Sequence, residues 1–334
     1  ALNYLHLDKF DDAFVEIRRV NNKLNLLEDK YKKMAENFNK NKKAKKKFKI
    51  AENEFHNSAL ARYLSMLLYK TEGKLDDARI DRNKILEAFK LQSHIYNFSP
   101  PVFLKKKRLD NDTKLYLLGF TGNSPDKKAN TLWIHTEKNT LIIAASKENP
   151  RGNQALKELD VINWPGIKKG YHFKFQLPQM KKFGSNVSKI KVKINGEYKE
   201  ELELLENMEN VAFETYKLKK PIIYLKTITR TVTKGLASTA GKKKISKQVS
   251  NPFVDFLARA AVDMAVDATE NADLRVSRFF PAMAYVNELE IEPGEYDITL
   301  EYYNKQGNLI DKQKYPQFKV SRNSLNLIET YYLN

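Results

Sequence analysis

The sequence contains no cysteine, which excludes a disulfide framework, a thiolate metal site and a cysteine nucleophile within this chain. It also lacks any apolar run of about eighteen residues, the length at which a segment becomes a candidate membrane-spanning helix. The most apolar helical stretch is 253–268, and charged residues interrupt it throughout, so it is amphipathic. Those charged residues are Asp255, Arg259, Asp263 and Asp267.

Motifs for catalysis, cofactors and metals are missing as well. The stretch from Gly235 to Gly241 resembles a phosphate-binding loop, but it has five residues between the glycines instead of four, and Lys243 stands where the magnesium-binding hydroxyl belongs. No two of the five histidines have the sequence spacing of a metal-ligand pair, so we expect His135 and His172 to be ordinary strand residues. We therefore predict no catalytic residue, no cofactor and no metal site.

Acidic residues are outnumbered, and the net charge is +18. Such a basic surface favours acidic partners, which include nucleic acid, anionic lipid and acidic proteins. A lysine-rich, asparagine-rich composition is also what a compositionally biased genome produces. Charge alone therefore does not identify a partner.

A short pattern occurs twice, sixty-five residues apart, and the rest of the chain can be organised around it. Each copy has a tyrosine, five residues, a large apolar residue and then Asp-Asp-Ala. The two copies are Tyr4, Asp11, Asp12 and Ala13, and Tyr69, Asp76, Asp77 and Ala78. We interpret each copy as a helix end, a turn and a new helix whose first turn carries two carboxylates, where they suit the helix dipole. The small alanine allows two helices to cross closely. Arrays of such helical hairpins are binding scaffolds.

Residues 1–98 have helical periodicity throughout, and the pair Pro100-Pro101 then ends the helical part of the chain. The first copy of the pattern starts close to Ala1, without a complete helix before it, so we expect a preceding segment. Two lysine clusters form a candidate basic contact surface. They are Lys42, Lys43, Lys45, Lys46 and Lys47, and Lys242, Lys243 and Lys244. Because few aromatic residues accompany the first cluster, it favours solvent or a phospholipid surface over nucleic acid.

Residues 102 to about 230 have the pattern of short strands. The expected strands include 115–120, 131–135, 140–144, 171–175 and 190–194. Turns are expected at Glu137–Asn139 and at Asn195-Gly196, the strongest short hairpin signal, after which 197–206 should return antiparallel. The β-branched stretch Ile222–Val232 fits a strand or the start of a helix.

The rest of the chain is expected to add one helical segment and three more strands. The helical segment covers 235–272; it begins with a polar, basic loop over Gly235–Lys247, and its helix runs from Pro252 to about Ala272. The strands 284–291, 296–302 and 314–320 then complete the sheet, so that the strand-rich part forms a β-sandwich.

Several stretches, in this order, resemble an uncharacterised family of bacterial tetratricopeptide-repeat-containing envelope lipoproteins. The matching stretches are Asp11–Asn21, Pro221–Arg230, Ala272–Arg275 and Ile291–Tyr296. The resemblance implies export to the periplasm and an outer-membrane lipid anchor upstream of Ala1. It supplies no catalytic residue.

The sequence thus predicts an α+β protein with two domains. Residues 1–98 form a tetratricopeptide-like helical repeat domain, and 102–334 form an antiparallel β-sandwich domain with a helical insertion at about 235–272. We predict a non-enzymatic scaffold or adaptor of a bacterial cell-envelope assembly that binds other envelope proteins, as a homo- or hetero-oligomer, through its helical repeats. The alternatives are an envelope protein that binds anionic lipid or polysaccharide, and an enzyme that acts on cell-wall material.

Overall fold

The computed structural model describes residues 1–39, 58–106, 112–148, 154–239, 272–277 and 280–334, and it is a mixed α+β structure with several antiparallel sheets. The helices are α1 (Leu2–Leu5), α2 (Phe10–Asn39), α3 (Ala59–Thr71), α4 (Leu75–Leu91) and α5 (Met208–Thr239), with a 3₁₀ turn η1 at Val102–Lys105. The strands are β1 (Lys114–Asn123), β2 (Asp126–Glu137), β3 (Thr140–Glu148), β4 (Gln154–Asn163), β5 (His172–Lys181), β6 (Lys189–Ile194), β7 (Glu197–Glu201), β8 (Glu203–Asn207), β9 (Pro281–Glu290), β10 (Gly294–Tyr303), β11 (Leu309–Val320) and β12 (Asn326–Tyr332).

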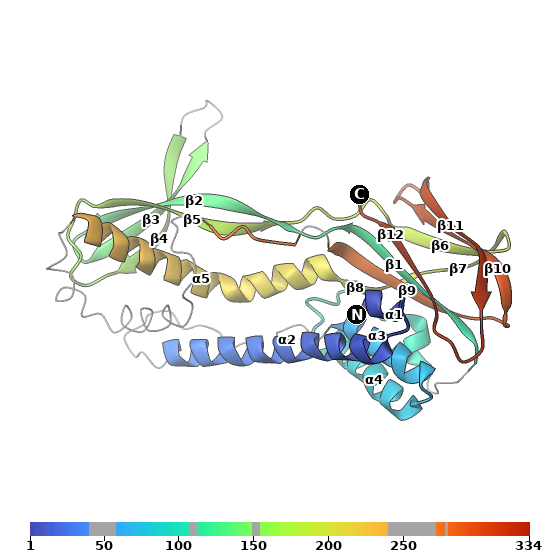
Figure 1. Ribbon diagram of the computed structural model, residues 1–334. Coiled ribbons are helices and arrows are strands. Elements are labelled where there is room, and N and C mark those ends of the chain that lie inside the picture. The colour runs from blue at the N-terminus through green and yellow to red at the C-terminus, as the bar shows by residue number, and fades with distance from the viewer. Residues whose placement is uncertain (40–57, 107–111, 149–153, 240–271, 278–279) are drawn as a thin grey trace.

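The strands form three sheets of four. Sheet A has the order β12-β1-β9-β8, sheet B the order β4-β3-β2-β5, and sheet C the order β11-β10-β6-β7. The pair β1–β12 is parallel, and the other pairs are antiparallel. The molecule is elongated, with sheets A and C at one end and sheet B at the other (Figure 1). Helices α1 to α4 lie under sheet A, and the long helices α2 and α5 extend from there toward sheet B (Figure 1).

Strand β1 is buried on both faces, which explains its continuous apolar sequence. Its side chains alternate between two cores, as the two-residue period of a strand requires. Tyr116, Leu118 and Phe120 pack in the core shared with helices α1 to α4. Leu115 and Leu117 pack in the core between sheets A and C. This strand therefore lies between the core of the helical part and the core of the two sheets.

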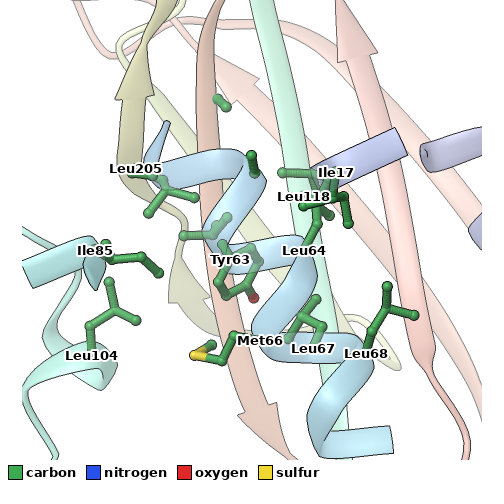
Figure 2. Packing of buried hydrophobic residues seen from close by; sticks show 14 of the residues in the cluster. Ile17, Tyr63, Leu64, Met66, Leu67, Leu68, Ile85, Leu104, Leu118 and Leu205 are labelled. Atoms are coloured by element: carbon green, nitrogen blue, oxygen red, sulfur yellow. The ribbon is translucent and has the colours of Figure 1, made fainter. Parts of the chain in front are cut away.

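Helix α3 lies at the centre of the helical part. Its N-cap is Ser58, whose hydroxyl accepts a hydrogen bond from the Ala61 backbone. Ile85 and Leu104 lie on one side of α3, and Ile17 and Leu118 lie on the other (Figure 2). The apolar side chains of α3 thus bury themselves against α4, α2 and sheet A at once.

Sheet B carries α5 on one face. Ile228 and Val232 of α5 share a core with Ile134 and Phe175 of the sheet. The approach is close at Gly235, because a Cβ atom there would lie 2.1 Å from the Phe173 ring. The absence of a side chain at Gly235 thus allows α5 to pack against the Phe173 ring.

Several expectations from local patterns are confirmed. Asn195-Gly196 forms the turn between β6 and β7, and both residues have positive φ, at 51° and 86°. The turn before Thr140 has Asn139 at φ 58°, and β2 pairs with β3 across it.

Other expectations are wrong. Residues 197–206 do not form a single returning strand, because β7 pairs in sheet C and β8 pairs with β9 in sheet A. The stretch Ile222–Val232 is helical, one of the two alternatives that its pattern left open, but its helix α5 begins at Met208, well before the expected Gly235. Residues 235–239 belong to this helix, not to a loop, and 240–271 lie outside the described residues. The strand β12 has no counterpart among the strands expected from the sequence.

Candidate functional site

The two Asp-Asp-Ala patterns fold into turns that share a backbone hydrogen bond closed by the tyrosine carbonyl. In the first, the Lys9 amide donates to the Tyr4 carbonyl at 2.9 Å, and in the second the Lys74 amide donates to the Tyr69 carbonyl at 2.8 Å. Four residues after each tyrosine the chain enters the left-handed region, at φ 53° for Asp8 and 73° for Gly73. Asp and Gly are among the residues that adopt this conformation most readily. The two turns therefore share this hydrogen bond and a left-handed residue at the same position.

The side chains of the pattern divide between the interior and the surface. Ala13 and Ala78 are completely buried, in the same core. Their amides donate to the Lys9 and Lys74 carbonyls at 3.0 and 3.1 Å, which starts each new helix. The aspartates that precede each alanine are exposed: Asp11, Asp12, Asp76 and Asp77. The tyrosines are partly buried, and the Tyr69 ring lies 4.8 Å from that of Phe14, so the two copies contact one another.

A further pair of positions repeats with the same sixty-five-residue offset. Val15 and Ile80, two residues after each alanine, are 46% and 54% exposed. Leu26 and Leu91, thirteen residues after each alanine, are 67% and 55% exposed. Positions eleven residues apart lie on the same face of a helix. Each copy thus presents a β-branched residue and a leucine to solvent on one helical face.

The helical part is fixed to sheet A by buried polar contacts. The Lys70 ammonium lies 3.1 Å from the Glu288 carboxylate, and both side chains are almost completely buried. Burial raises the pKa of the nearby Tyr63 hydroxyl well above its usual value, and the charge of Glu288 raises it further. Because unpairing a buried charge is costly, this contact opposes separation of α3 from the sheet.

The candidate basic contact surface lies outside the described residues. This holds for both lysine clusters, Lys42, Lys43, Lys45, Lys46 and Lys47, and Lys242, Lys243 and Lys244. Two other lysines have unusual surroundings. Burial lowers the pKa of Lys219, with Lys127 adding to the effect, and burial lowers the pKa of Lys226, with Lys30 and Arg230 adding to it.

The structure brings together two histidines, His135 and His172, that were expected to be ordinary, separate strand residues. His135 of β2 and His172 of β5 are direct cross-strand partners, with their Nδ1 atoms 3.1 Å apart. Their meeting depends on pairing between strands that are not consecutive, which no local spacing reveals. No group of three or more metal-ligating side chains assembles within the ranges that the structure describes.

No protein-family model matches the chain, and comparison with curated proteins and with solved structures finds no match.

Proposed function

We propose that this chain is a non-enzymatic scaffold or adaptor of a bacterial cell-envelope assembly, and that it binds partner proteins through its helical part. The observation that carries the proposal is the repeated exposure of Val15 and Leu26 on α2 and of Ile80 and Leu91 on α4. Single exposed apolar residues are common on protein surfaces. Recurrence at the same two positions of an internal repeat is a more specific pattern, which a contact surface explains.

The surroundings of these residues suit a scaffold. The equivalent turns at Tyr4 and Tyr69 fix the direction in which α2 and α4 leave their turns. The shared core and the Lys70–Glu288 pair hold the helices on sheet A. A pre-ordered surface binds with a smaller loss of conformational entropy than a flexible one. We infer that the helical part presents its exposed apolar residues as a rigid unit.

The proposed location is the periplasm, on the outer membrane, as the family resemblance of the sequence implies. None of the helices in the described ranges is both long and apolar enough to cross a membrane. Fractionation of native cells tests the location directly. Recovery in the cytosolic fraction would contradict the envelope part of the proposal.

The partner-binding part is tested by copurification from native membranes with the double variant Val15→Asp/Ile80→Asp. Charged residues at these two positions should remove a defined partner that copurifies with the wild type. Leu309→Asp is the matched control, because Leu309 is 47% exposed and lies on β11, outside the repeat. Retention of every partner by the double variant, or equal loss with the control, would contradict the proposal.

A second candidate is binding to an anionic lipid or polysaccharide surface. It is favoured by the half-buried Lys219 and Lys226, whose pKa values are lowered first by burial and then by neighbouring cations, Lys127 for the former and Lys30 and Arg230 for the latter. An anionic ligand relieves such repulsion. Pelleting with acidic liposomes at low salt tests it. Replacement of Lys42, Lys43, Lys45, Lys46 and Lys47 with Gln should abolish pelleting, and rising salt should weaken it. Unchanged pelleting would mean that these lysines interact with solvent and not with the lipid surface.

A further inference from the structure

The histidine pair lies on the face of sheet B opposite α5. Ile134 and Phe173, each next to one of the histidines in sequence, pack in the core that includes α5. Because successive side chains of a strand point to opposite faces, His135 and His172 lie on the other face. His135 is 38% exposed there.

The backbone pairing places the two side chains close together. The amide of Thr136 donates to the Tyr171 carbonyl at 3.0 Å, which makes the adjacent pair, His135 and His172, a non-hydrogen-bonded one. In such pairs the Cα atoms are closer and the side chains are in contact. The register of the sheet, and not a flexible loop, therefore sets the distance between the imidazoles.

The two rings meet at their Nδ1 edges. The Nδ1 atoms are 3.1 Å apart, whereas the ring centroids are 4.4 Å apart. When two imidazole nitrogens bind the same Zn²⁺ ion in tetrahedral geometry, each lies about 2.0–2.1 Å from the ion. The two nitrogens then lie about 3.3–3.4 Å from one another. The observed separation differs from this by a few tenths of an ångström, a shift that partly exposed side chains can make.

A carboxylate sets the tautomer of His135. The Nε2 atom of His135 lies 3.3 Å from a carboxylate oxygen of Glu137, and the other oxygen of Glu137 lies 3.1 Å from the Lys169 ammonium. The two oxygens of Glu137 therefore each face a donor, one the His135 ring and the other the Lys169 ammonium. Nε2 of His135 must then carry the proton, which leaves the lone pair of Nδ1 directed at His172.

We propose that His135 and His172 chelate a divalent transition-metal ion of the zinc, nickel and copper class through their Nδ1 atoms, with Glu137 as the positioning residue. Neutral imidazole is the commonest protein ligand for these ions, and metal-binding histidines usually donate their other N–H to a carboxylate or carbonyl group. Neutral His172 needs only to move its proton from Nδ1 to Nε2, so binding to the neutral pair releases no proton. With two protein ligands, the ion keeps positions for water or for a donor from a partner. The ion would also connect β2 to β5, the edge strand of sheet B.

The test is isothermal titration calorimetry of the tag-free protein with ZnCl₂ and, separately, with CuCl₂. We expect one saturable site, with tighter binding of Cu²⁺ than of Zn²⁺. His135→Gln and His172→Gln should each weaken binding at least about tenfold, and Glu137→Gln should weaken it about 10–100-fold. His94→Gln is the matched control, because His94 is an exposed histidine away from sheet B, and it should bind as the wild type does.

Two further measurements separate metal binding from folding. Circular dichroism and melting in EDTA should show that the histidine variants remain folded. In ¹⁵N-resolved spectra of the imidazoles, His135 should be the Nε2–H tautomer in the wild type, and this preference should be lost in Glu137→Gln. The proposal is overturned if the wild type shows no saturable binding up to about 1 mM metal. It is also overturned if the His135 and His172 variants bind like the wild type, or if His94→Gln is weakened equally.

Discussion

Glu206 of β8 accepts a hydrogen bond from the Leu60 backbone amide of α3 at 2.6 Å, across 146 residues of sequence. The same carboxylate accepts from the Ser58 hydroxyl at 3.0 Å, and the Tyr96 hydroxyl accepts from the Ala59 amide at 3.1 Å. The first amides of a helix have no partner within the helix. Glu206 of sheet A therefore adds to the Ser58 cap of α3, and the helix is docked by its N-terminus as well as by its apolar side chains.

Glu206→Ala should destabilise the protein by about 2 kcal/mol, because it leaves the partly buried Leu60 amide and the buried Ser58 hydroxyl without this acceptor. Urea denaturation followed by circular dichroism measures the change in the free energy of unfolding. The control is Glu197→Ala, at an exposed position, which should change stability by less than about 0.5 kcal/mol. Equal effects of the two substitutions would count against a capping role.

Ala78→Leu, and likewise Ala13→Leu, should cost about 1–3 kcal/mol, because each alanine is completely buried where the helices pack. Thermal unfolding checks this prediction. Arg79→Leu, at the exposed neighbouring position, should leave the melting temperature almost unchanged. If Ala78→Leu melts at the wild-type temperature, the helices do not pack closely at this alanine.

Gly235→Ala should destabilise the protein, although alanine is favoured over glycine in a helix by about 1 kcal/mol. The reason is the Phe173 ring, which a Cβ atom at 235 would meet at 2.1 Å. The double variant Gly235→Ala/Phe173→Leu should recover part of the loss, since leucine leaves room at this contact. A stabilising effect of Gly235→Ala alone would show that α5 does not approach β5 so closely.

Lys219→Met should raise the melting temperature at pH 7, and the gain should shrink as the pH approaches about 10.4, the ordinary lysine pKa. Burial, with Lys127 nearby, lowers the pKa of Lys219 in the folded state, so the unfolded chain binds more protons between the two pKa values. Wild-type stability therefore rises with pH in that window, and the methionine variant lacks this contribution. Lys219→Arg, which stays charged, should show no gain at pH 7. A gain for Met that is independent of pH would contradict this explanation.

Local signals in the sequence predicted local structure well. The Asn195-Gly196 turn and the two Asp-Asp-Ala turns depend on residues that are adjacent or nearly adjacent, and the structure has all three. The apolar run of β1 was also recognisable as a strand, although its burial on both faces depends on helices and strands far away in sequence.

The features that could not be predicted depend on contacts between segments that are far apart in the sequence. The parallel pairing of β12 with β1 and the cross-strand contact of His135 with His172 join segments that no hairpin connects. The stretch Ile222–Val232 is rich in β-branched residues, which favour strands, but Ile228 and Val232 become buried against sheet B as parts of a helix. Gly235 was expected to begin a loop, but it lies in α5, where its small size allows the helix to approach sheet B.

The central claim, that the repeated exposed residues of α2 and α4 contact partner proteins, is tested most directly by photocrosslinking in native cells. A photoreactive amino acid would replace Ile80, Leu91 or Val15 in turn, with Leu309 as the control position. We predict a discrete adduct with the same partner, identified by mass spectrometry, from the repeat positions and not from Leu309. Absence of any adduct at all three repeat positions, or the same adducts from Leu309, would contradict the claim.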